Sequence, residues 1–247
     1  MSIRIVTDSS CDLPQAAVDE HNIRIVPLSI RFGDDEFIDR EELTPEQFWA
    51  NCAASATLPE TAAPAPGQIE QAYRDLAADG ATGIVVVTLS GALSATMQSA
   101  ELAARSVTDV VPVQVVDTRS VTLGVGTIAL ACARAGRDGA SIDDVADLAR
   151  SLADRTRVFG ALDTLENLKK GGRIGNARAF LGTALAIKPI IEVVDGQVEE
   201  GGKQRTRSKA LKFLVDKVAS FDGEISDLAV LHADCDDVDE FVAMLAP

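Results

Sequence analysis

Aromatic residues and basic charge are both scarce in this chain. Phe, Trp and Tyr make up 4% of the 247 residues, although hydrophobic residues as a whole make up 47%. Any apolar cavity would therefore be lined by Ala, Leu, Ile and Val, and such walls suit an aliphatic ligand. The formal net charge of −15 argues against general nucleic-acid binding, because a phosphate backbone needs a basic face that displaces its counterions.

Few residues of the kinds that make catalytic or metal sites are present. His21 and His232 are the only histidines, neither stands where a catalytic base is recognisable, and no G-x-S-x-G sequence marks a serine hydrolase. The acidic cluster at 234–239 lacks the glycine and spacing of a calcium loop. The cysteines show neither C-x-x-C spacing nor the density of a disulfide scaffold, so we expect reduced thiols at Cys11, Cys52, Cys132 and Cys235. We predict no catalytic residue, no cofactor and no metal site.

Long apolar runs are missing as well. No run approaches the roughly 18 residues of a spanning helix, and the N-terminus lacks a basic region followed by an apolar stretch. The sequence therefore predicts a cytoplasmic protein without stable membrane insertion.

Strand-like runs alternate with helical periodicity, which is typical of an α/β protein. In the first part of the chain we expect strands at 3–7, 23–32, 84–89 and 113–116, with helices at 44–54, 69–78, 94–105 and 142–153 and another that ends near 137. Residues 55–67, rich in Pro and Ala, are predicted to form a loop. The strand, turn and helix at 84–105 form the kind of unit where α/β proteins bind ligands.

The pattern changes after residue 155. Strands are expected at 158–162, 190–194, 197–200 and 228–232, and helices after Thr164 and at 177–187, 208–220 and 238–245. Asp195-Gly196 predicts a tight hairpin turn. We therefore predict two α/β lobes, residues 1–155 with a Rossmann-like parallel sheet and residues 156–247 with a smaller mixed sheet.

Two local features could bind anions. Ser94 is placed at a helix N-terminus, where free amides and the helix dipole favour a carboxylate or phosphate, although it could equally be an ordinary helix cap. Residues 169–212 hold ten Lys and Arg against four Asp and Glu, a net charge of +6 that leaves −21 for the rest of the chain. Such a basic stretch fits either a specific anionic partner or two solvated helices.

Several segments together resemble the DegV family of bacterial fatty-acid-binding proteins, the acyl-carrying subunits of the fatty acid kinase system. They span nearly the whole chain in the family's order: V-T-D-S-S-C-D-L-P at 6–14, I-V-P-L-S at 25–29, T-A-A-P at 61–64, L-S-G-A-L-S-A-T-M-Q at 89–98, V-D-T-R-S at 116–120, L-K-K-G-G-R-I at 168–174, K-P-I at 188–190 and R-T-R at 205–207.

The resemblance implies a long-chain fatty acid, such as palmitate, stearate or oleate, held between the two lobes. Matched to the family's motifs, the hydroxyls of Thr61 and Ser94 and the backbone amide of Ala95 would bind the carboxylate. Arg173 and Arg205 would meet a separate kinase, which phosphorylates the acid to an acyl-phosphate. The protein itself would then be no enzyme. The alternatives are a stand-alone lipid-sensing or transport protein and a phosphate-binding phosphotransferase.

The chain also departs from the family's pattern. Ala62, Ala63 and Ala95 stand where more polar residues or glycine are usual, so Thr61 and Ser94 would carry more of the head-group binding. Family members continue to a C-terminal strand bearing an H-T/V-G-x-G motif, whereas this chain stops at Pro247. We therefore expect the second lobe to lack the family's last strand.

Overall fold

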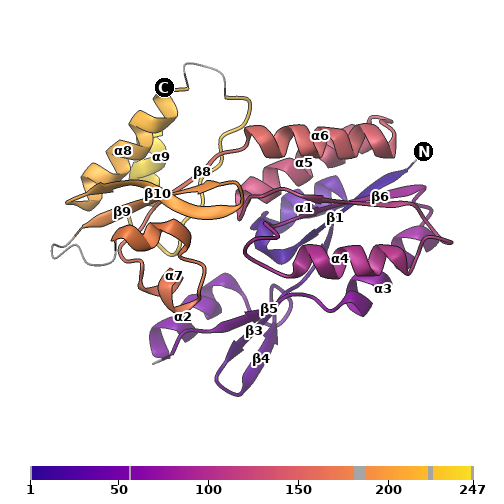
Figure 1. The fold of residues 1–247 in the computed structure, drawn as a ribbon, viewed down its shortest axis with the longest axis horizontal. Coiled ribbons are helices and arrows are strands. Elements are labelled where there is room, and N and C mark those ends of the chain that lie inside the picture. Colours follow the sequence, from indigo (N-terminus) through magenta and orange to yellow (C-terminus); the bar gives the residue numbers. More distant parts are fainter. Residues whose placement is uncertain (1, 56, 181–186, 222–224, 246–247) are drawn as a thin grey trace. The chain divides into compact units, whose positions relative to one another are not determined.

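The computed structural model of the protein describes residues 2–55, 57–180, 187–221 and 225–245 (Figure 1). The chain falls into two compact units, Met1–Thr156 and Arg157–Pro247. No helix in the described ranges is both long and apolar enough to cross a bilayer.

The first unit is built on four parallel strands in the order β2-β1-β6-β7, namely β1 (Ile3–Asp8), β2 (Arg24–Val26), β6 (Gly83–Thr88) and β7 (Val113–Asp117). Every residue of β6 is buried, which explains its unbroken run of apolar residues. The strand that follows β1 in the sequence, β2, is added on one side of β1, whereas β6 and then β7 are added on the other side. The strand order therefore reverses between β1 and β6, which makes this place a topological switch point. The predicted α/β class with a parallel first sheet is confirmed.

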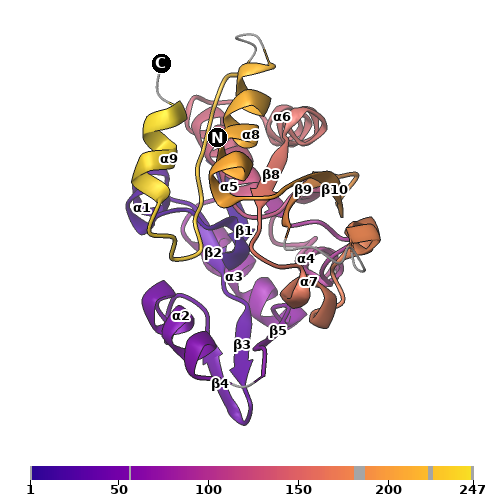
Figure 2. The same cartoon turned by 90° about the vertical axis from the view of Figure 1, so that its left-hand side faces the viewer.

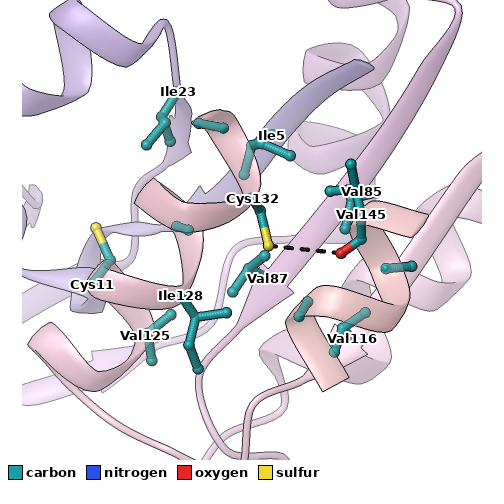
Figure 3. Packing of buried hydrophobic residues seen from close by; sticks show 14 of the residues in the cluster. Ile5, Cys11, Ile23, Val85, Val87, Val116, Val125, Ile128, Cys132 and Val145 are labelled. Atoms are coloured by element: carbon teal, nitrogen blue, oxygen red, sulfur yellow. Dashed lines mark hydrogen bonds between the residues drawn. The ribbon is translucent and has the colours of Figure 1, made fainter. Parts of the chain in front are cut away.

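Helices cover both faces of this sheet. One face packs against α1 (Gln15–His21), α5 (Leu123–Arg137) and α6 (Ile142–Arg155), and the other against α3 (Pro66–Ala78) and α4 (Thr96–Arg105). Figure 3 shows the first face, where the Sγ of Cys132 lies 3.8 Å from the carbonyl oxygen of Val145 between α5 and α6. Tight packing is possible because α5 is rich in small residues: a Cβ on Gly136 would lie 3.0 Å from the carbonyl oxygen of Ile3.

Residues 29–62 leave the parallel sheet and form what we call the arm (Figure 2). Its antiparallel sheet has the order β4-β3-β5 and is accompanied by a helix, with bounds β3 (Ser29–Phe32), β4 (Asp35–Ile38), α2 (Pro45–Ala54) and β5 (Glu60–Ala62). Phe32 contacts Phe37 and Phe48 edge to face, with ring centroids 6.4 and 5.9 Å apart, and Phe48 contacts Trp49 at 5.0 Å. A chain of aromatic contacts therefore joins the arm's sheet to its helix.

The arm corrects two sequence predictions. Residues 23–32 were predicted as one strand, but β2 ends at Val26 and β3 begins at Ser29 in a different sheet. Pro27 lies in the break and has no N–H for a ladder. The predicted loop at 55–67 contains β5, a short edge strand that pairs with β3.

The second unit has an antiparallel sheet in the order β10-β9-β8. Its elements are β8 (Val158–Ala161), α7 (Glu166–Lys170), the 3-10 helix η2 (Gly175–Phe180), β9 (Lys188–Val194), β10 (Gln197–Gln204), α8 (Arg207–Ala219) and α9 (Val238–Leu245). The hairpin predicted at Asp195-Gly196 joins β9 to β10, with φ of 49° and 80° at the two turn residues. Over the residues described, every pairing in this sheet is antiparallel, where the sequence predicted a mixed sheet.

Two elements predicted for this unit differ. A helix was predicted at 177–187. Its first residues belong to the 3-10 helix η2, which ends at Phe180, and residues 181–186 lie outside the described residues. The strand predicted at 228–232 was wrong, because that segment pairs with no strand in the described part of the chain. Leu228 and Leu231 are 52% and 50% exposed, so the apolar residues that suggested a strand have no sheet to cover them.

Candidate functional site

Polar side chains are buried together where β1, β6 and β7 end. We call this set the polar floor; each member is less than 5% exposed, and its members are Thr7, Asp8, Ser9, Thr88, Ser90, Thr118 and Ser120. The Thr118 hydroxyl donates across to the carbonyl oxygen of Thr88 at 2.9 Å, and within the segment after β7 the Ser120 amide donates to Thr118 Oγ1 at 3.1 Å. The floor thus lies at the switch point, the usual ligand position of such sheets.

Asp8 is the buried carboxyl of this floor. Its Oδ1 accepts from the amide of Ser10 at 3.0 Å and from the Ser10 hydroxyl, and its Oδ2 accepts from the amide of Leu89 at 3.1 Å. Burial raises the pKa of Asp8 above its usual value, against the opposing effect of these hydrogen bonds. The carboxyl therefore links the end of β1 to the end of β6.

Residues 89–95 form the turn that leads from β6 to α4. Its first part is held by the end of β7 and the segment after it, because the Ser90 amide donates to the carbonyl oxygen of Ser120 at 2.9 Å and the Gly91 amide lies 3.2 Å from both carboxylate oxygens of Asp117. A Cβ on Gly91 would lie 3.0 Å from Asp117 Oδ2, so glycine permits this close approach. The turn closes with the Ser94 amide donating to the carbonyl oxygen of Ser90 at 3.1 Å.

Ser94 and Ala95 lie just before the first turn of α4. The sequence predicted that this helix begins at Ser94, but it begins at Thr96, and Ala95 is its N-cap residue. Ser94 Oγ accepts from the Thr96 amide at 3.3 Å and lies 2.9 Å from Thr96 Oγ1. Either hydroxyl can be the donor of the 2.9 Å contact, and where Thr96 donates, the Ser94 proton is available to a ligand. The Ala95 amide is a second donor, since none of the residues that the structure describes accepts from it.

Thr61 lies on β5, directly opposite Ile30 of β3. Its side chain is exposed, and within the described ranges its hydroxyl has no hydrogen-bond partner. It borders a surface hollow of about 200 Å³ together with Ser29, Arg31, Glu36, Glu60 and Ala62. Pro64, three residues further on, lines a void of about 10 Å³ with Thr88 and Thr96. The segments that carry Thr61 and Ser94 therefore reach the same end of the parallel sheet.

Arg173 and Arg205 belong to the second unit. Both are exposed; Arg173 Nη1 donates to the carbonyl oxygen of Gly171 at 2.8 Å, and Arg205 immediately precedes Thr206, the N-cap residue of α8. Arg207 is used differently, because its guanidinium holds Asp237 through bonds of 2.6 and 2.8 Å and this pairing lowers the pKa of Asp237. Of the two arginines in the R-T-R segment, Arg205 is thus the one directed to solvent.

Sequence reasoning assigned no role to Asp8, Ser9 or Asp117. A signal was present, because the runs T-D-S-S at 7–10, T-L-S at 88–90 and D-T-R-S at 117–120 each begin at the end of a strand of the parallel sheet. Parallel strands bring such runs to one edge of a sheet. In the described part of the chain, no group of three or more His, Cys, Asp or Glu side chains could hold a metal ion.

Comparisons with known proteins agree on the family. The family model described as "Uncharacterised protein, DegV family" matches residues 2–246. A DegV domain-containing protein of Streptomyces coelicolor is 37% identical over 231 residues, which cover 93% of this chain and 81% of that protein. A solved DegV family protein from Thermus thermophilus, described by its fatty acid binding, aligns with a TM-score of 0.83 and 36% identity over 91% of this chain and 79% of its own.

A solved stearic acid-binding protein from Eubacterium ventriosum aligns with a TM-score of 0.79 and 27% identity, over 89% of this chain and 76% of its own. These similarities cover both units and most of each relative. The chain belongs to the DegV family.

Proposed function

We propose that this protein binds a long-chain fatty acid, such as palmitate, stearate or oleate, and presents its carboxylate to a separate kinase that forms an acyl-phosphate. The observation that carries the proposal is the start of α4, where the part-buried Ser94 hydroxyl stands next to the Ala95 amide, from which no described residue accepts. Thr61 supplies a third donor from the arm. The fatty acid binding described for the Thermus thermophilus and Eubacterium ventriosum proteins supports a carboxylate as the anion.

The proposed division of labour follows from the energetics of the ligand. About 14 to 18 methylenes contribute roughly 0.8 kcal/mol each when buried, before ordering costs are subtracted, so the chain supplies the affinity. The head group sets the direction of binding. A buried carboxylate without partners is costly, and two hydroxyls with one amide satisfy it through charge-assisted hydrogen bonds.

Mass spectrometry of lipid extracted from the purified protein tests the ligand directly. A tightly held acyl chain should co-purify, and a long-chain fatty acid is expected in an amount that matches the protein. Delipidated protein should then bind added palmitate. The proposal fails if no acyl chain is extracted and the delipidated protein does not bind palmitate.

The basic stretch at 169–212 supports the kinase part of the proposal. Its net charge of +6 stands out on a chain of −15, and an ATP-dependent kinase brings phosphate charge to the carboxylate. Several of these cations are already paired within the second unit, such as Lys188 with Asp163 at 2.6 Å and Lys212 with Asp216 at 2.8 Å. Arg173 and Arg205 are exposed and match the family's motifs, and we assign these two residues to the kinase.

Charge reversal at the two arginines should separate kinase docking from lipid binding. For Arg173→Glu with Arg205→Glu, we expect kcat/KM of the partner kinase for the fatty-acid-loaded protein to fall about 10-fold or more. Charges at the rim of a protein–protein interface govern the rate at which the two proteins associate. Palmitate affinity should not change. The control is Arg105→Glu with Arg137→Glu, which alters the net charge equally on exposed helix ends of the first unit. Phosphorylation unchanged in the Arg173 and Arg205 variant would instead favour a stand-alone lipid sensor or transporter.

A further inference from the structure

The turn that follows β1 is bonded to two segments that are remote in sequence. This turn is η1 (Ser9–Cys11), and Asp8 precedes it as the N-cap residue. Asp8 Oδ2 accepts from the amide of Leu89 at 3.1 Å, and Ser9 Oγ accepts from the amide of Leu28 at 3.1 Å. Asp8 and Ser9 are each 2% exposed; the bond from Leu89 to Asp8 is buried, and the bond from Leu28 to Ser9 is partly buried.

The bond from Asp8 leads to Ser94. Leu89 is the first residue of the turn at 89–95, and its neighbour Ser90 accepts the amide of Ser94 at 3.1 Å. The position of Ser94 is therefore set by a short chain of hydrogen bonds that begins at the Asp8 carboxyl.

The bond from Ser9 leads to Thr61. Leu28 directly precedes β3, and Ile30 of β3 is paired with Thr61 of β5. The place where the arm leaves the parallel sheet is thus fixed by the Ser9 hydroxyl.

We infer that Asp8 and Ser9 are positioning residues that hold Ser94 and Thr61 in register for one carboxylate. Neither residue touches the ligand. The inference rests on the proposed fatty acid function and adds residues to its site. It explains how two donors that lie 33 positions apart in sequence can be kept at a fixed separation although one of them belongs to an arm outside the sheet.

The chemistry of Asp8 fits this role better than a packing role. A buried carboxyl is unfavourable where an apolar side chain would fill the same space, and here burial raises its pKa. Its two oxygens serve two different segments, Oδ1 the η1 turn and Oδ2 the end of β6. An asparagine has one acceptor oxygen and could keep only one of these connections.

The test compares palmitate with hexadecanol, which has the same chain length and no carboxylate. In Ser9→Ala and in Asp8→Asn we expect palmitate affinity to fall about 5-fold while hexadecanol affinity changes by less than about 2-fold, because only the head-group bonds are misplaced. A change that merely loosened the fold would weaken both ligands. Tyr73→Phe is the matched control, because it also removes a buried hydrogen bond, the one of 3.3 Å from the Tyr73 hydroxyl to the carbonyl oxygen of Ala100. This variant should keep the wild-type ratio of palmitate affinity to hexadecanol affinity.

A double-mutant cycle then identifies the path. Because Ser9 acts through Thr61, adding Ser9→Ala to Thr61→Val should lower palmitate affinity no further. Additive losses, or a Ser9→Ala variant that keeps the full preference for palmitate over hexadecanol, would overturn the inference. If Ser9→Ala does not fold, Ser9→Cys keeps the size and replaces the oxygen by a weak acceptor. Failure of the wild-type protein to bind palmitate would instead refute the proposed function.

Discussion

Replacing Thr61 by Val and Ser94 by Ala together is expected to weaken palmitate binding by at least about 10-fold, because each lost charge-assisted hydrogen bond contributes about 1.5–3 kcal/mol. Both changes nearly preserve side-chain volume. Ser94 also accepts from the Thr96 amide, so its removal withdraws one partner from the start of α4 as well as one donor from the ligand. The carboxylate would keep the Ala95 amide, which comes from the backbone and survives both substitutions.

Calorimetric titration of delipidated protein measures this effect. The single variants should each show part of the loss, and hexadecanol should bind the double variant about as well as it binds the wild type. Thr108→Val with Ser151→Ala is the control, because it removes two exposed hydroxyls of the same unit that lie outside the site. Palmitate affinity equal to that of the wild type in the Thr61 and Ser94 variant would refute the assignment of both hydroxyls.

Gly126→Ala is expected to destabilise the first unit despite the better helix propensity of alanine. A Cβ at this position of α5 would lie 2.5 Å from the carbonyl oxygen of Cys11 and 2.9 Å from Leu13 Cδ2. A backbone carbonyl cannot move away from a clash as easily as the end of a side chain can. We therefore expect the free energy of unfolding to fall by about 2 kcal/mol or more and Tm to fall by roughly 4–8 °C. Thermal unfolding followed by circular dichroism measures it.

Gly67→Ala is the matched control for this prediction. Gly67 lies in the first turn of α3, and a Cβ there would meet no atom within 4 Å. That substitution should be neutral or slightly stabilising. Since Cys11 closes the η1 turn, Gly126→Ala should also lower palmitate affinity by displacing Ser9. A Tm at or above that of the wild type would show that α5 can shift away from the turn.

The parallel sheet could be predicted from the sequence because its central strands are rich in apolar residues and β6 is buried along its whole length. The apolar runs at 84–89 and 113–116 match β6 and β7 to within one residue at each end. The run at 23–32 is also rich in apolar residues, yet it is divided between two sheets, with Pro27 in the break. The run at 228–232 shows the converse, since a strand forms only where another strand offers its hydrogen bonds.

The site could be predicted only in part. The turn before a helix marked Ser94 either as an anion-binding residue or as a helix cap, and its pairing with Thr61 came from the resemblance to the DegV family alone. Asp8 and Ser9 escaped because their partners, Leu89 and Leu28, lie 81 and 19 residues away. Such bonds depend on strand order and on where the arm departs, neither of which any local pattern encodes.

The aromatic contacts of the arm give it a spectroscopic label. Trp49 is the only tryptophan of the chain and lies in α2, in contact with Phe48, which in turn touches Phe32 of β3. Fluorescence excited selectively in the indole band therefore originates from the arm, which also carries Thr61 in β5. Its emission wavelength and quenching report the arm's surroundings without any introduced dye.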